Sequence, residues 1–201
     1  MNSARPYPNS RLGFKLSGSD VAREFPNLES LSGQSLTLEH KILLSYLGSV
    51  EQILEVLYGQ VTLKVLKQRE SGDHIFRESE MLKASDGDTL IRASSVISKP
   101  AMKISILRKI REKKVGIGSI LTEHKVEHLR NITEIGYDFA ASCPFRRYTI
   151  IHSHMRAIRI MELVLPWTKG KIQKSVDRVG FEPTTSAMPM PYPTGLDDRP
   201  K

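Results

Sequence analysis

The sequence predicts an α+β protein built on a six-stranded antiparallel sheet. Six segments after residue 60 alternate apolar and polar residues with the two-residue period of a half-buried strand. Short turn signals join several of these segments in hairpin succession, which favours antiparallel pairing. Segments with helical spacing stand before and between the strands, so helices and sheet belong to one fold.

The chain is expected to divide into three parts. Its 201 residues, 39% apolar and 26% charged, are typical of one globular domain with extensions. Residues 1–35 are rich in Ser, Pro, Asn and Gly and predict a poorly ordered N-terminal extension. The domain itself is expected over 36–168. Residues 169–201 are rich in proline, lack periodicity and predict a disordered tail.

The tail also has a coding explanation. Its Gly-Phe-Glu-Pro string at 180–183 can be encoded by a sequence resembling the reverse complement of the T-arm of transfer RNA genes. Our hypothesis is that the tail is a read-through or gene-model artefact. The absence of a transfer RNA gene on the opposite strand would reject it.

The domain is expected to begin with a helical hairpin. Apolar residues recur at helical spacing from Leu36 to Gly59, and Gly48-Ser49 provides a break and a new cap. A further helix is expected over 100–114, followed by a glycine-hinged turn, "VGIGSIL", at 115–121.

The six strands follow the hairpin. They are predicted at 60–68, 74–84, 89–97, 123–136, 146–153 and 156–166. Asp86-Gly87-Asp88 is a hairpin turn signal between the second and third strands, and a short turn near Ser153 joins the last two.

Charge and cysteine content narrow the class of protein. The net charge of +8 raises the question of a nucleic-acid partner, but the basic residues are dispersed. The densest group, within 108–114, follows apolar residues at helical spacing and indicates a solvated helix end. A pocket for an anionic small molecule explains the charge equally well. The single cysteine, Cys143, excludes an intrachain disulfide and is interpreted as a small buried side chain.

No targeting or membrane-spanning pattern is evident. The first ten residues are polar, and no window approaches the roughly 18 apolar residues of a membrane span. The expected location is the cytoplasm, with no membrane and no nucleic acid as partner.

Two groups of histidines are candidate metal ligands. His124, Glu127 and His128 match the H-x-x-E-H pattern, which must be helical to place both histidines on one zinc ion. In the predicted strand, positions four apart lie roughly 13 Å from each other. His152 and His154 share a strand face, but the adjacent Ser153 indicates an exposed hairpin. No metal site is therefore predicted.

Glu162 is the charged residue that needs an explanation. It lies in "RAIRIMELVLP" at 156–166, between Met161 and Leu163, with no cation within two positions. Acidic residues are seldom buried without a partner. Other charged residues of the strands, among them Arg146 and Arg147, are expected on a solvated sheet face.

Four segments together resemble the chorismate pyruvate-lyase family, in particular its archaeal branch. Residues 48–68 are similar to its helix and first strand, 79–97 to its central hairpin, 115–136 to its glycine turn and long strand, and 161–166 to its terminal strand. The resemblance covers about 36–166. It implies a six-stranded antiparallel sheet with helices on one face and flap-like helices over a buried pocket.

The resemblance also implies a reaction. Chorismate would lose its enolpyruvyl side chain as pyruvate, and the ring would become 4-hydroxybenzoate for a cofactor pathway. No cofactor is implied, because aromatisation drives the reaction. The enzyme would orient a dianion and manage protons, and it would be a monomer or a homodimer.

The family's site residues carry over to this chain in part. Glu162 falls on the pocket glutamate, a proton donor or hydrogen-bond partner of a substrate oxygen; an apolar environment favours the protonated form. Ile117 falls on the residue whose backbone amide contacts the ring carboxylate, and Val50 on an apolar pocket residue.

The carboxylate-binding arginine does not carry over directly. A gapless match places Ser79 at its position, and Arg77 lies two residues earlier on the same strand face, about 7 Å away. Arg77 is one candidate, and Arg130 or Arg147 is another. If none of them serves, this copy is weak or inactive. Gly116 stands where the family often has proline, which predicts a looser turn.

Two other functions stay open. The same fold resembles effector-binding domains of bacterial repressors, so the chain could sense a small ligand without catalysis. No helix-turn-helix precedes residue 36, which argues against this. A basic RNA-binding module is the third possibility, and the scarcity of aromatics near the basic residues argues against it.

Overall fold

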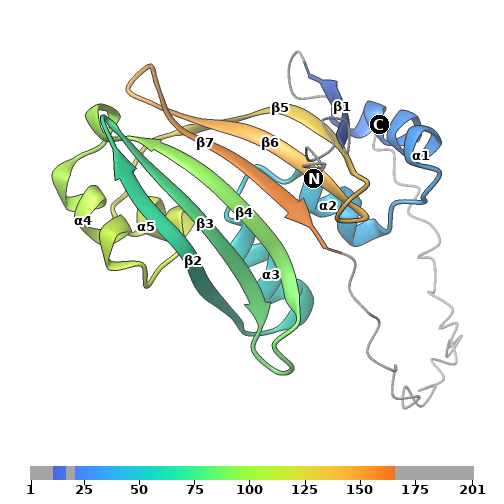
Figure 1. Cartoon of the computed structure of the whole chain (residues 1–201), viewed down its shortest axis with the longest axis horizontal. Helices are drawn as coiled ribbons and strands as arrows, with labels where there is room; N and C mark the ends of the chain where they lie inside the picture. Colours follow the sequence, from blue (N-terminus) through green and yellow to red (C-terminus); the bar gives the residue numbers. More distant parts are fainter. Residues whose placement is uncertain (1–10, 17–20, 166–201) are drawn as a thin grey trace, which may run out of the picture. The chain divides into compact units, whose positions relative to one another are not determined.

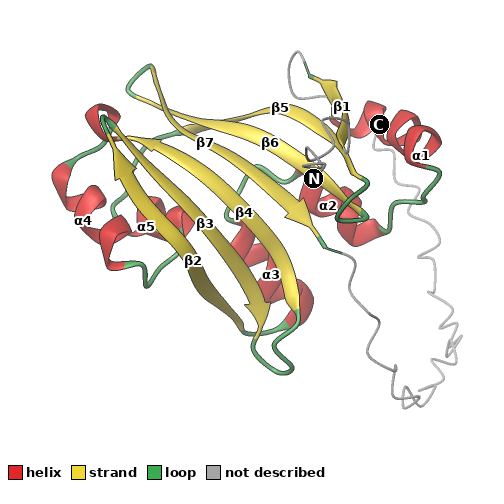
Figure 2. Ribbon diagram, viewed as in Figure 1, coloured by secondary structure: helices red, strands yellow, loops and turns green. Residues whose placement is uncertain are grey.

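Seven strands form one antiparallel sheet in a computed structural model that describes residues 11–16 and 21–165 (Figures 1 and 2). The strand order is β1-β5-β6-β7-β4-β3-β2. The strands are β1 (Arg11–Lys15), β2 (Val61–Ser71), β3 (His74–Lys83), β4 (Thr89–Ser98), β5 (Leu129–Asp138), β6 (Cys143–His152) and β7 (Met155–Val164). The predicted α+β class and antiparallel sheet are confirmed, but the predicted number of six strands is wrong.

The additional strand, β1, comes from the segment predicted as a poorly ordered extension. It pairs with β5 from Arg11 opposite Asp138 to Lys15 opposite Glu134. Gly13 lies opposite Gly136, and a Cβ at Gly136 would collide with the Leu12 carbonyl group and the Phe145 ring. The two glycines therefore permit a close approach of the two strands. Strand β1 was not predicted, because its five residues show little alternation of apolar and polar side chains.

Helices precede β2 and connect β4 to β5. They are η1 (Val21–Glu24), α1 (Phe25–Ser32), α2 (Leu38–Ser45), α3 (Val50–Tyr58), η2 (Lys99–Ala101), α4 (Ile104–Glu112) and α5 (Ile117–Glu123). The predicted hairpin corresponds to α2 and α3; the Thr37 side chain caps α2, and Ser49 occupies the N-cap position of α3 without a side-chain hydrogen bond to it. The predicted helix at 100–114 corresponds to η2 and α4, and its basic end is exposed as expected.

The prediction for residues 115–136 needs two corrections. The expected glycine turn is followed at once by α5, and the expected strand at 123–136 begins only at Leu129. The Val126 amide donates to the Leu121 carbonyl at 2.9 Å, so the residues after α5 continue its hydrogen bonding before the strand starts. Residues 123–128 belong to the alternating segment that predicts a strand, but they do not form a strand.

One face of the sheet is covered and the other is largely open. Figure 1 shows α2, α3 and α5 behind the strands. Along β7, Ile158, Ile160 and Glu162 are buried on the covered face, whereas Arg159 on the alternate side is exposed. A site built on this sheet therefore lies between the strands and the helices.

The chain ends lie partly beyond this description. The N-terminal extension was predicted over 1–35; its described residues include β1, η1 and α1, whereas residues 1–10 and 17–20 fall outside the description. The prediction of a disordered or artefactual tail at 169–201 also falls outside the described residues. Within the described ranges, no helix combines the length and the apolar character that crossing a membrane requires.

Candidate functional site

A small cavity lies between the covered face of the sheet and the first residues of α3 and α5. Its volume is about 50 Å³, well below the roughly 300–1,000 Å³ of typical ligand pockets. All six residues predicted to form the site line it: Val50, Arg77, Ser79, Ile117, Arg130 and Glu162. They come from α3, α5 and three strands, so the fold brings together residues up to 112 positions apart in sequence.

Small side chains in the middle of the sheet create the space. Ala93 of β4 lies opposite both Ser79 of β3 and Glu162 of β7. In the next row, Ser95 of β4 lies opposite Arg77 and Ile160. Opposed residues of antiparallel strands share a face, so Arg77 and Glu162 extend over a floor of alanine and serine.

Glu162 is held by two protein groups. Arg146 donates from Nε to Oε2 at 2.7 Å, and the Tyr148 hydroxyl donates to Oε1 at 2.8 Å. The side chains of Arg146 and Glu162 are only 2% and 7% exposed. The expectation of an apolar environment for Glu162 is therefore wrong: no cation lies within two positions in the sequence, but strand pairing places Arg146 directly opposite. The expectation that Arg146 is solvated is wrong for the same reason.

Tyr148 connects the acid to two arginines. Its ring centre lies 5.0 Å from the Arg146 guanidinium carbon and 5.9 Å from that of Arg130, distances typical of cation–π contact. Burial, and then the charge of Glu162, raise the pKa of Tyr148 far above its ordinary value of 10.0. The phenol therefore stays protonated and acts as a hydrogen-bond donor to Glu162.

Arg77 is a buried cation with unused donors. It is 2% exposed, and its Nη2 donates to the Val115 carbonyl at 3.0 Å. Its Nε and Nη1 atoms are buried without an acceptor, and burial lowers the pKa of its guanidinium. Ser79, two residues along, lines the same cavity. The site thus contains an arginine near the expected position, two residues earlier in the chain.

Of the other two candidate arginines, one lines the cavity and the other does not. Arg130 enters the cavity from β5, where its Nη1 donates to the Gly48 carbonyl. Arg147 points to the opposite face of the sheet and pairs with Glu134 at 2.7 Å. The alternative that Arg147 binds a carboxylate in this cavity is therefore overturned.

Glu51 is a cavity residue that sequence reasoning missed. It lies in the first turn of α3 and accepts a hydrogen bond from Ser119 of α5. A Cβ at Gly116 would lie 2.8 Å from Glu51 Oε2, so glycine permits this approach. Gly116 has φ −64°, a value that proline also adopts. The contact ties α5 to α3 above the cavity.

The remaining candidate groups lie outside this site. The H-x-x-E-H pattern begins at the C-cap residue of α5, His124, and lies in the connection to β5, and His154 lies in the β6–β7 turn with φ 61°. Among the described residues, no three histidine, cysteine, aspartate or glutamate side chains come together as metal ligands. Cys143 is buried as predicted, and burial raises the pKa of its thiol to about 12.

The chain is similar to a protein with a provisional functional name. A protein of Methanocaldococcus jannaschii, whose name describes it provisionally as a lyase, is 28% identical over 154 residues. The match covers 68% of this chain and 82% of that protein. No protein-family model matches the chain.

Proposed function

We propose that this protein is a chorismate lyase that forms 4-hydroxybenzoate and pyruvate. The observation that carries the proposal is that one cavity contains both Arg77, a buried arginine with unused donors, and Glu162, a carboxylate held by two protein groups. Buried cations are normally paired, so Arg77 indicates an anionic ligand. The similarity to a protein named provisionally as a lyase supports the reaction class.

Four of the cavity residues would contact the substrate in this reaction. The ring carboxylate would bind Arg77, helped by the Ile117 amide, which lies in the first turn of α5 and has no acceptor within the helix. Glu162 would accept a hydrogen bond from the ring hydroxyl, because its oxygens retain lone pairs beyond those used by Arg146 and Tyr148. Val50 would contact the ring.

The reaction balances without a cofactor or co-reactant. The bond between the ring carbon and the enolpyruvyl oxygen breaks, and the neighbouring hydroxyl-bearing carbon loses its proton. The C–H electron pair completes the aromatic ring, and enolpyruvate takes up a proton at its methylene carbon to become pyruvate. The protein needs to hold the dianion and exclude competing geometries.

Since the cavity is smaller than the substrate, its roof must open. Three hydrogen bonds close it: Arg77 to Val115, Ser119 to Glu51 and Arg130 to Gly48. A ligand carboxylate on Arg77 would compete with the Val115 carbonyl and favour separation of α5 from the sheet. This arrangement is consistent with α5 acting as a flap.

Incubation of the full chain with chorismate tests the proposal. Equal amounts of 4-hydroxybenzoate and pyruvate are expected, measured by chromatography and a coupled lactate dehydrogenase assay. Folded protein that forms neither product rejects the lyase. If it nevertheless binds 4-hydroxybenzoate in calorimetry, the result favours an effector-sensing domain of the same fold.

A further inference from the structure

Two arginines enter the cavity without an acidic partner. Arg77 has Nε and Nη1 unused, and the Nε of Arg130 is also buried without an acceptor. Within residues 11–16 and 21–165, neither guanidinium forms an ion pair with a carboxylate. Arg146 differs, because its charge is already matched by Glu162. The site therefore contains two cations that form no ion pair with a carboxylate of the described residues.

Arg130 is fixed in place by its surroundings. Its Nη1 donates to the Gly48 carbonyl, and its guanidinium lies over the Tyr148 ring. A Cβ at Gly118 would lie 3.2 Å from Arg130 Nη2 and 3.2 Å from Ser49 Oγ. The absence of a side chain at Gly118 thus keeps α5, the loop before α3 and the arginine close together. A guanidinium held on three sides needs little ordering to bind an anion.

The two arginines reach the cavity from strands that are not neighbours in the sheet. Arg77 is on β3 and Arg130 on β5, and the strands between them are β4, β7 and β6. Four interstrand steps amount to about 19 Å along the sheet. Both side chains line the same cavity, so a ligand with an anionic group at each end can contact both guanidinium groups.

We propose that Arg130 binds a second carboxylate, so that the ligand of this cavity is a dicarboxylate held between Arg77 and Arg130. This inference rests on the proposed function and assigns the ring carboxylate to Arg77 and the side-chain carboxylate to Arg130. Carbon–oxygen cleavage then leaves 4-hydroxybenzoate on one arginine and pyruvate on the other. Arg130 discriminates the dianionic substrate from the monoanionic ring product.

The cavity carboxylates do not remove this preference. Glu162 is matched by Arg146, and Glu51 accepts from the neutral Ser119 hydroxyl. With Arg77, Arg130 and Glu51 counted, one positive charge remains to attract an anion. A second ligand carboxylate adds a charge-assisted hydrogen bond to Arg130, the stronger class of hydrogen bond.

Two unreactive probes test the inference apart from turnover. The first, 3-(carboxymethoxy)benzoate, has a ring carboxylate and an ether-linked carboxylate; the second, 3-methoxybenzoate, lacks the latter. Calorimetry on the full chain should show at least about tenfold tighter binding of the dicarboxylate. Arg130→Ala should abolish that difference, and Arg130→Lys should restore part of it. Arg77→Ala should weaken both probes.

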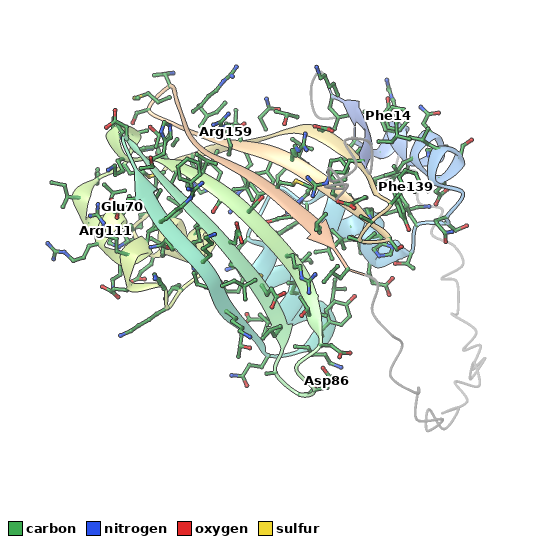
Figure 3. All side chains as sticks on the ribbon, viewed as in Figure 1. Phe14, Glu70, Asp86, Arg111, Phe139 and Arg159 are labelled. Atoms are coloured by element: carbon green, nitrogen blue, oxygen red, sulfur yellow. The ribbon has the colours of Figure 1, made fainter. Side chains whose placement is uncertain are left out.

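The matched control is Arg159→Ala, which removes an exposed arginine from the opposite face of the sheet and should change neither affinity (Figure 3). Circular dichroism melts establish that each variant is folded. Equal binding of both probes by the wild type, or a preference that survives in folded Arg130→Ala, would overturn the inference. Because neither probe reacts, a failure to turn over chorismate affects the proposed function without deciding this result.

Discussion

Arg146 and Glu162 form a buried ion pair across β6 and β7, with Nε 2.7 Å from Oε2. Removal of one member leaves a buried charge without its counterion, which typically costs about 3–5 kcal/mol. Arg146→Met should therefore lower the free energy of unfolding by about that amount, measured by urea denaturation. The Tyr148 hydroxyl would remain as the second partner of Glu162.

The control for this prediction is an exposed pair of the same chemistry. Arg111 and Glu70 also approach to 2.7 Å, but their side chains are 46% and 36% exposed. Arg111→Met should cost far less, because water solvates the remaining carboxylate. If the two arginine variants lose equal stability, the Arg146–Glu162 pair is not acting as a buried ion pair.

Glu162→Gln tests the proposed catalytic carboxylate. Glutamine keeps the size of the side chain but weakens acceptance from a ring hydroxyl, so kcat should fall by about 10²–10³ with a smaller change in KM. Steady-state kinetics of pyruvate release provide the measurement. Glu127→Gln is the control, because Glu127 is exposed between α5 and β5 and should retain wild-type kcat. Equal losses in both variants would show that the site lies elsewhere.

The sheet residues of the site could be predicted from the sequence, but Arg146 as the partner of Glu162 could not. Alternation placed Arg77, Ser79 and Glu162 on strands, and the resemblance selected them. Counting back from the β6–β7 turn, where His152 pairs with Met155, places Phe145 opposite Glu162. A bulge between Ile150 and Ile151 shifts the register by one residue and brings Arg146 there instead. A bulge of this kind leaves no clear sequence signal.

The contact between α3 and α5 above the cavity could not be predicted from the sequence either. Glu51 and Ser119 are 68 positions apart and meet because the first residues of α3 and α5 border the same cavity. Periodicity identifies a helix face, whereas the meeting of two helix starts depends on tertiary packing. Strand β1 was missed for a related reason, because its pairing with β5 depends on the close approach at Gly13 and Gly136.

Glu51→Gln should strengthen anion binding in the cavity. The substitution removes a negative charge that lines the same space as Arg77, and the amide oxygen can still accept from Ser119. The dissociation constant of 4-hydroxybenzoate should fall about two- to tenfold, as measured by calorimetry at low salt. Glu55→Gln, one turn along α3 and exposed, should leave it unchanged. Weaker binding in Glu51→Gln would instead indicate that Glu51 accepts a hydrogen bond from the ligand.

Glu70→Gln should reduce stability in a pH-dependent way. Glu70 of β2 accepts from Arg111 of α4 at 2.7 and 3.0 Å, where both residues are labelled in Figure 3. The hydrogen bonds from Arg111, with added attraction from Lys99, lower the pKa of Glu70 from 4.5 to about 2. Because the folded state lowers this pKa, the charged carboxylate stabilises the fold fully above pH 4.5. That stabilisation is lost as the pH falls toward about 2.

Thermal melts of the wild type and Glu70→Gln should therefore differ in Tm near neutral pH, with the wild type higher. The difference should narrow as the pH falls below about 4.5, and it should also shrink at high salt because the pair is exposed. Glu78→Gln, an exposed carboxyl without an ion pair among the described residues, is the matched control and should produce no such pH dependence. A Tm difference that stays constant from neutral to acidic pH would show that Glu70 anchors α4 by packing rather than by charge.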